Sequence, residues 1–178
     1  MRVVVGLVAL SWLMVSACAS SSKVFPSKVM EGVDSNFDFV NWHRMAEGSD
    51  SRKVQFGGRI VQAESSRDSV TIVVSQLPIV QHPAYGPKDN RKDNGEFVIV
   101  FHGTIDAADL QAGNRVMVVG LTRPRENVTV NDRPRNLPIV AAECLHFWNT
   151  QGREIADFPF SGGAGYVTLR QETVCAKN

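Results

Sequence analysis

The stretch VQFGGRIV at residues 54–61 decides the fold that this sequence predicts. Apolar side chains recur at every second position along it, including Val54, Phe56 and Ile60, which is typical of a half-buried β-strand. Two neighbouring glycines, Gly57 and Gly58, interrupt the strand, and such a pair indicates a β-bulge or a tight bend. We therefore expect a first strand that curves strongly.

The same period of two returns in four later segments, at residues 70–77, 96–102, 115–121 and 137–148. In the first two of these, one face carries a purely apolar set, made of Val70, Ile72, Val74, Phe97, Ile99 and Phe101. Residues 65–68 are typical of a turn, and residues 81–95 are rich in Pro, Gly, Asp and Asn, which predicts a long surface loop.

Helical patterns are short. Phe39, Trp42 and Met45 recur at helical spacing behind a potential capping residue, Asp38, and predict one amphipathic helix at residues 38–46. We expect its apolar side to plug the domain, although aromatic residues close to a membrane anchor also suit the interface. A single helical turn is expected at residues 106–111, capped by Asp106.

Five substantial strands with few helices predict a mainly β fold. Closing the sheet removes the exposed edges of a flat one, so we expect a small antiparallel OB-like β-barrel with short helical elements. A β-sandwich is the alternative, because periodicity does not specify strand order.

The N-terminus has the three parts of a secretory signal: a positive Arg2, an apolar run over residues 3–15, and small residues before a cleavage point. The apolar run is shorter than the ~20 residues that span a bilayer. The residue after the cleavage point is Cys18, and this arrangement resembles the lipobox of bacterial lipoproteins. The resemblance implies that Cys18 carries a diacylglyceryl group and becomes an acylated N-terminus. Ala19 stands where an aspartate would resemble an inner-membrane retention signal, so the resemblance points to the outer membrane.

Three parts are thus expected: a signal peptide at residues 1–17, a Ser-rich lipidated tether at residues 18–23, and one domain at residues 24–178. Removal of 17 from the 178 residues leaves 161, which suits a single domain. The chain has 19 Lys and Arg against 18 Asp and Glu, and Arg2 leaves with the signal. A balanced charge gives no indication of nucleic-acid binding.

Several segments together resemble the Slp family of starvation-inducible outer-membrane lipoproteins. In order along the chain they are FGGRIV at residues 56–61, QLP at 76–78, GEF at 95–97, RVMVVG at 115–120 and LPIV at 137–140, followed by Leu145 and Trp148. The resemblance implies an anchored protein of the Gram-negative outer membrane, associated with stress or stationary phase, without an established catalytic activity. Asn114 separates Gly113 from Arg115 where a Gly-Arg pair is common in the family, and the tail after Asn149 has no clear counterpart.

With Cys18 used by lipid, two cysteines remain, Cys144 and Cys175. In an oxidising periplasm they are expected to form a disulfide that closes a loop of roughly 30 residues. Two separate buried thiols are the alternative.

Motifs of enzymes are missing from the sequence, which contains no His-Glu-x-x-His, Gly-x-Ser-x-Gly or P-loop. The four histidines, His43, His82, His102 and His146, fall in different predicted elements without the spacing of metal ligands. We therefore predict no catalytic residue, no metal and no cofactor.

Two matching triplets, RPR at residues 123–125 and at 133–135, flank residues 126–132. If the intervening residues form a hairpin, four guanidinium groups (Arg123, Arg125, Arg133 and Arg135) converge on one end of the domain, where they are able to bind phosphate. The alternative is a solvated arm, partly neutralised by Glu126 and Asp132.

The expected function is therefore that of a non-enzymatic outer membrane lipoprotein of the Slp type, on the periplasmic face, in envelope structure or stress response. The alternative is a periplasmic module that binds an anionic envelope lipid or glycan through the arginine-rich segment.

Overall fold

A computed structural model describes residues 24–45, 50–81, 85–88, 94–151, 153 and 170–176. The signal peptide, Cys18 and the tether of residues 18–23 lie outside the described residues. Two short helices, α1 (Ser27–Met30) and α2 (Phe39–Met45), precede a mainly β domain. Its strands are β1 (Lys53–Ser65), β2 (Ser69–Leu77), β3 (Ile79–Val80), β4 (Gly86–Pro87), β5 (Glu96–His102), β6 (Arg115–Val130), β7 (Arg133–Asn149) and β8 (Arg170–Cys175). The predicted mainly β class is confirmed.

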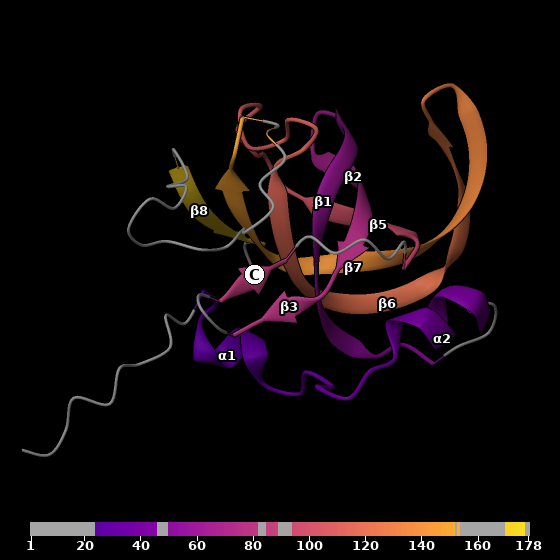
Figure 1. Ribbon diagram of the computed structural model, residues 1–178, viewed down its shortest axis with the longest axis vertical. Coiled ribbons are helices and arrows are strands. Elements are labelled where there is room, and N and C mark those ends of the chain that lie inside the picture. The colour runs from indigo at the N-terminus through magenta and orange to yellow at the C-terminus, as the bar shows by residue number, and fades with distance from the viewer. Residues whose placement is uncertain are drawn as a thin grey trace, which may run out of the picture.

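The main sheet has the order β5-β2-β1-β6-β7-β8, and β5 also pairs with β7. This last pairing joins β1, β2, β5, β6 and β7 into a closed ring of strands, called the ring below, which wraps around one interior (Figure 1). All its pairings are antiparallel except that of β5 with β7, which is parallel. Within the described residues, no helix is long and apolar enough to cross a membrane.

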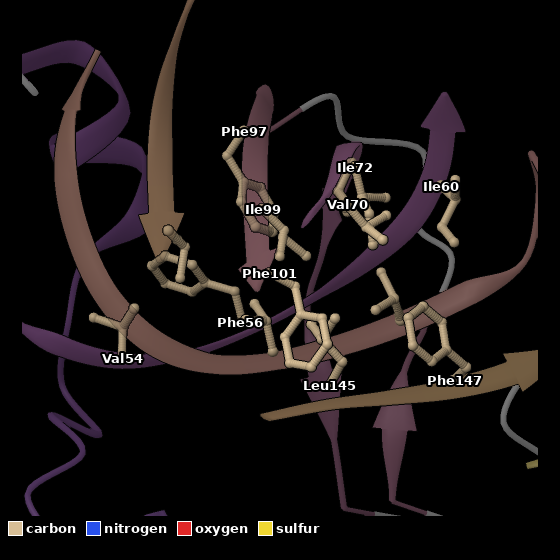
Figure 2. Close-up of a cluster of buried hydrophobic side chains, with 14 of the residues drawn as sticks. Val54, Phe56, Ile60, Val70, Ile72, Phe97, Ile99, Phe101, Leu145 and Phe147 are labelled. Carbon is tan, nitrogen blue, oxygen red and sulfur yellow. The ribbon is translucent and has the colours of Figure 1, made fainter. Parts of the chain in front are cut away.

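The interior of the ring is filled by alternate residues of its strands, as the period of two predicts. Figure 2 shows the side chains of β1, β2, β5 and β7 pointing toward one another. The predicted apolar face is confirmed as part of this cluster, which contains Val70, Ile72, Val74, Phe97, Ile99 and Phe101.

The predicted amphipathic helix is present as α2. Asp38 caps it, because its Oδ1 accepts a hydrogen bond from the Asn41 amide at 3.0 Å. Phe39 packs against the rings of Phe56 and Phe97, with centroids 5.1 and 5.6 Å away, and Trp42 is buried in the same cluster. Met45 does not join them and is 60% exposed. The helix therefore plugs the interior with its first turn and leaves its last residue in solvent.

The glycine pair on β1 allows close approach of two strands. A Cβ atom on Gly58 would lie 2.3 Å from Val74 Cγ1 and 2.4 Å from the Ser75 carbonyl oxygen, so a larger residue would push β2 away. The register with β2 continues through both glycines, and the β-bulge lies between Ile60 and Gln62. The β-bulge therefore does not fall on the glycine pair itself.

The connections are shorter or more ordered than the sequence predicts. Residues 107–110 form hydrogen-bonded turns in place of the expected helical turn, although Asp106 Oδ1 does accept the Ala108 amide at 2.9 Å. Within the expected long loop at residues 81–95, β4 pairs with β3. Leu110 in these turns packs against the inner cluster, and Ile79 on β3 packs against a second, outer cluster.

The hairpin of β6 and β7 is the largest departure from the predicted strands. Both strands run on to a two-residue turn at Asn131 and Asp132, whose φ angles of 48° and 61° suit a type I′ turn. The last residue of β6 that pairs with β1 is Leu121, and the first residue of β7 that pairs with β5 is Ile139. Between them, residues 122–138 form a two-stranded extension, called the arm below. Figure 1 shows it in orange, curling around one side of the ring, with its tip on the side opposite to α1 and α2.

Candidate functional site

The arm carries both arginine triplets, so they are strand residues. Opposite residues of an antiparallel pair share a face. Arg133 and Arg135 lie opposite Val130 and Val128, and Arg123 lies opposite Ile139, so these three arginines share one face. A β-bulge at Pro124 turns Arg125 to the other face, opposite Pro138. The register therefore places three of the four predicted arginines on the face that also carries Val128 and Val130, spread along the arm, and it does not bring all four together.

The arm is docked on the outside of the ring. Its apolar residues pack against outward-facing valines of the ring in a cluster made of Val73, Val98, Val130, Leu137 and Ile139, with Val61, Val100 and Val128 partly buried beside it. Two polar contacts hold it further: Gln62 Oε1 accepts the Asn131 amide at 2.9 Å, and Arg135 Nη1 lies 2.5 Å from Glu96 Oε2. Arg135 is thus engaged within the molecule, while Arg123 and Arg133 are exposed.

A second outer layer lies over β6 and β7, where residues 24–33, called the strap below, cover the sheet. Phe25 is buried there with Met117, Val119, Cys144 and Trp148. The hydroxyl of Thr173, on β8, donates a hydrogen bond to the Val24 carbonyl oxygen at 3.1 Å. The chain that follows the predicted lipid attachment point is therefore fixed to β6, β7 and β8 from its first described residue.

A disulfide between Cys144 and Cys175 joins β7 to β8 under this layer. The two cysteines are directly opposite in the antiparallel register, with Cα atoms 4.0 Å apart, and they are 31 positions apart in sequence. Cys144 is buried, whereas Cys175 is exposed. The predicted pair is thus a covalent link between the last long strand and the tail.

His146 sits between the strap and β8. Its ring lies 4.2 Å from that of Trp148 and 6.4 Å from that of Phe25, and its Nδ1 lies 2.7 Å from Thr173 Oγ1. Because the Thr173 hydroxyl donates to Val24, we assign Nδ1 as the donor to Thr173. Burial lowers the pKa of His146 to about 4, and the hydrogen bond with Gln171 opposes this shift, so the ring is neutral at pH 7.

The other end of β8 is held by charge. Arg170 contacts Asp106 at 2.8 Å and Asp109 at 2.9 Å, and also Glu172 on its own strand. The three carboxylates raise the pKa of Arg170. Burial raises the pKa of Asp109, against the attraction of Arg170, while a backbone hydrogen bond and Arg170 lower that of Asp106. Sequence reasoning missed this cluster, because Arg170 and Asp106 are 64 positions apart.

The histidines in the described residues do not meet. His43 packs against the Phe39 ring on α2, His102 lies opposite Ser69 at the exposed end of β5, and His146 lies opposite Met117. His82 lies outside the described residues. Across the part of the chain that the structure describes, no group of three or more His, Cys, Asp or Glu side chains is placed to hold a metal ion.

The site thus consists of a mainly β ring with an N-terminal strap fixed to its outer face and a tail strand joined to it by a disulfide. Comparison with known protein families identifies the family of this chain. The model of the outer membrane lipoprotein Slp family matches residues 15–168, and the chain belongs to this family. The match includes Cys18 and ends before β8. No curated protein and no solved structure matches the chain.

Proposed function

We propose that this protein is a non-enzymatic lipoprotein held on the periplasmic face of the outer membrane through lipid on Cys18. The observation that carries the proposal is the strap. It is fixed to the domain from Val24, only six positions after Cys18. At ~3.5 Å per residue, an extended segment of this length reaches about 20 Å. The anchor therefore keeps the domain close to the bilayer, with the side that carries the strap toward the membrane.

A lipoprotein N-terminus carries several acyl chains, and this number matters. One chain gives only marginal membrane binding, whereas each buried methylene adds about 0.8 kcal/mol, so several chains hold a domain firmly. A domain placed in this way suits a role in envelope structure or in the stress response that the family resemblance implies. It requires neither a bound cofactor nor a reaction.

We further propose that the ring is an OB-like barrel. Its pairings run β1–β2–β5–β7–β6–β1, with the parallel pair between β5 and β7 and the turns of residues 107–110 between β5 and β6. A five-stranded Greek-key barrel of the OB type accounts for this order. It also gives the close approach of β2 at Gly58 a role in closing a small ring.

Mass spectrometry of protein extracted from membranes tests the anchor. The expected mature chain begins at Cys18 and carries acyl mass, and Cys18→Ala should release the domain from the outer-membrane fraction. Ser20→Ala is the matched control and should stay in that fraction. A mature chain that begins elsewhere without acyl mass would refute the proposal.

A second candidate function is binding of an anionic envelope lipid or glycan by the arm, which the exposure of Arg123 and Arg133 on one face favours. Each arginine near an anionic surface contributes about 1 kcal/mol. Arg123→Ser/Arg133→Ser should therefore weaken binding to vesicles with phosphatidylglycerol or lipopolysaccharide about thirtyfold, less so at high salt. Arg125→Ser, on the other face, is the control. Equal binding by all variants would remove this candidate.

A further inference from the structure

The disulfide lies beside a cavity that the proposed function does not use. A hollow of about 390 Å³ lies between the β1–β2 turn, the end of β5 and the end of β8. Its lining residues are Arg67, Asp68, Phe101, His102, Gly103, Thr104, Val174 and Cys175. The Gly103 amide donates to the Asp68 carbonyl oxygen at 3.0 Å, which fixes the two loops to each other. The cavity therefore has a defined wall and one cystine residue in its lining.

The two ends of the disulfide differ in access. Cys144 is 1% exposed and packs in the apolar cluster beneath the strap, whereas Cys175 is exposed and lies on the last strand of the sheet. A thiolate attacks a disulfide at the sulfur that it can reach. Arg67 carries a positive charge and His102 offers a ring N–H donor; both are exposed at the cavity and favour an incoming thiolate, and Asp68 is the one carboxylate among the lining residues.

We propose that the Cys144–Cys175 disulfide is a thiol–disulfide exchange site, which a dithiol reduces by entering the cavity at Cys175. One thiolate of the dithiol attacks Cys175 Sγ and forms a mixed disulfide. The bond to Cys144 breaks, and the Cys144 sulfur leaves with the electron pair and takes up a proton. The second thiolate of the dithiol then attacks the dithiol sulfur of the mixed disulfide. This step forms a disulfide within the dithiol and releases Cys175 as a thiolate, which takes up a proton. The dithiol is oxidised and the cystine is reduced.

Reduction has a structural consequence at the strap. β8 is held to the rest of the molecule at one end by Arg170, with its three carboxylates, and at the other by the disulfide. Between them Thr173 bonds both His146 and the Val24 carbonyl oxygen. Once the disulfide opens, the end of β8 nearest Cys175 keeps its backbone pairing with β7 and the bond from the Ala176 amide to the Glu143 carbonyl oxygen. It loses its covalent link, so this end frays more readily and Thr173 is held less firmly. The strap then keeps its apolar contacts through Phe25 but has a weaker bond to β8, so it opens more often. The consequence for the distance from the bilayer rests on the proposed anchor at Cys18.

The rate of native-state reduction tests the site. The full mature protein is treated with dithiothreitol, trapped with iodoacetamide and analysed by mass spectrometry. Arg67→Gln/His102→Gln should slow reduction at least threefold, whereas Lys28→Gln/Arg44→Gln, which removes two charges elsewhere, should not change it. Equal rates for both variants, or reduction only under conditions that unfold the ring, would overturn the proposal.

Hydrogen exchange tests the coupling in the wild-type chain, so that no cysteine variant has to fold. After reduction, amides of residues 24–33 should exchange at least tenfold faster, while residues 96–102 in the ring keep their rate. Unchanged exchange in the strap would contradict the coupling. The same measurements on Cys18→Ala should give the same results, because neither step needs lipid. Failure of the anchor therefore shows in the mass at Cys18, and failure of the redox site shows in these rates.

Discussion

The inside and the outside of the ring are both apolar, but different parts of the chain cover them. The inside is filled by side chains of the strands themselves, such as Phe97 and Ile99 on β5. The outside is covered by two distant segments, the strap over Met117 and the arm over Val98. A strand covered on both faces is buried without a break, as β6 is from Arg115 to Gly120, and its sequence is apolar at every position from Val116 to Val119. The comparison shows that the ring fills its own core, whereas segments outside its strand pairings, the strap and the arm, form the outer layers.

Substitutions at neighbouring residues of β5 give the sharpest version of this comparison. Phe97 points into the ring and Val98 lies under the arm, and both have no exposed surface. Phe97→Ala should lower the free energy of unfolding by about 3–5 kcal/mol, because it leaves a cavity in the interior. Val98→Ala should cost about 2 kcal/mol, since fewer apolar atoms are lost. Urea unfolding measures both, with the exposed Val40→Ala as control; equal losses would show that the two layers are equivalent.

Removing the disulfide tests the outer layer alone. The loop between Cys144 and Cys175 spans 31 positions, and on the chain-entropy model its closure contributes about 3 kcal/mol. Cys144→Ala/Cys175→Ala should lower the midpoint of urea unfolding by a corresponding amount while the far-ultraviolet circular dichroism is retained. Loss of the folded spectrum would mean that the ring itself depends on β8.

The pH dependence of stability tests His146, which belongs to the outer layer. Its pKa is about 4 in the folded state and 6.5 in the unfolded chain, so the unfolded state binds the proton first as pH falls. The contribution of His146 to the free energy of unfolding is at its full value above pH 6.5. It decreases between pH 6.5 and 4, by up to about 3 kcal/mol. Asp109, whose pKa is raised, acts in the opposite direction.

The difference between wild type and His146→Gln therefore isolates the histidine. The two urea-unfolding curves should converge as pH falls from 6.5 to 4. A constant difference over this range would contradict a neutral, buried His146.

The smallest effect is expected at the contact that fixes the arm by charge. Arg135 and Glu96 are partly exposed, with 43% and 20% of their side-chain surface accessible, and such pairs contribute about 0–1 kcal/mol. Glu96→Gln should therefore change the free energy of unfolding by less than 1 kcal/mol. The arm should stay docked, which hydrogen exchange of the Asn131 amide measures. A loss of protection as large as that in Val130→Ser would show that charge, and not apolar packing, holds the arm.

Part of this structure is predictable from sequence. The alternation at residues 54–61, 70–77 and 96–102 identified the strands and their inner face, because side chains of a strand alternate between its two faces. Spacing and a capping aspartate located α2, and the pair of triplets indicated the hairpin. Anchoring at Cys18 remains a prediction from the signal pattern.

Other features depended on contacts between residues far apart in the chain. The strands β6 and β7 extend to the arm because Val128 and Val130 find outward-facing valines to cover, and a local pattern contains no information about that partner. Likewise, a bulge at Pro124 separates Arg125 from the other arginines. The Arg170 cluster and the strap on β8 arise only when the tail returns to β7.

The sequence by itself determined the period of the strands, the inner face of the ring, the short helix, the cysteine pair and the family, because each depends on residues near one another or on order along the chain. Tertiary structure alone decided which strands meet, what covers the outside of the ring and which charges come together. These depend on how the β5–β7 pairing closes the ring, and closure is a property of the whole chain.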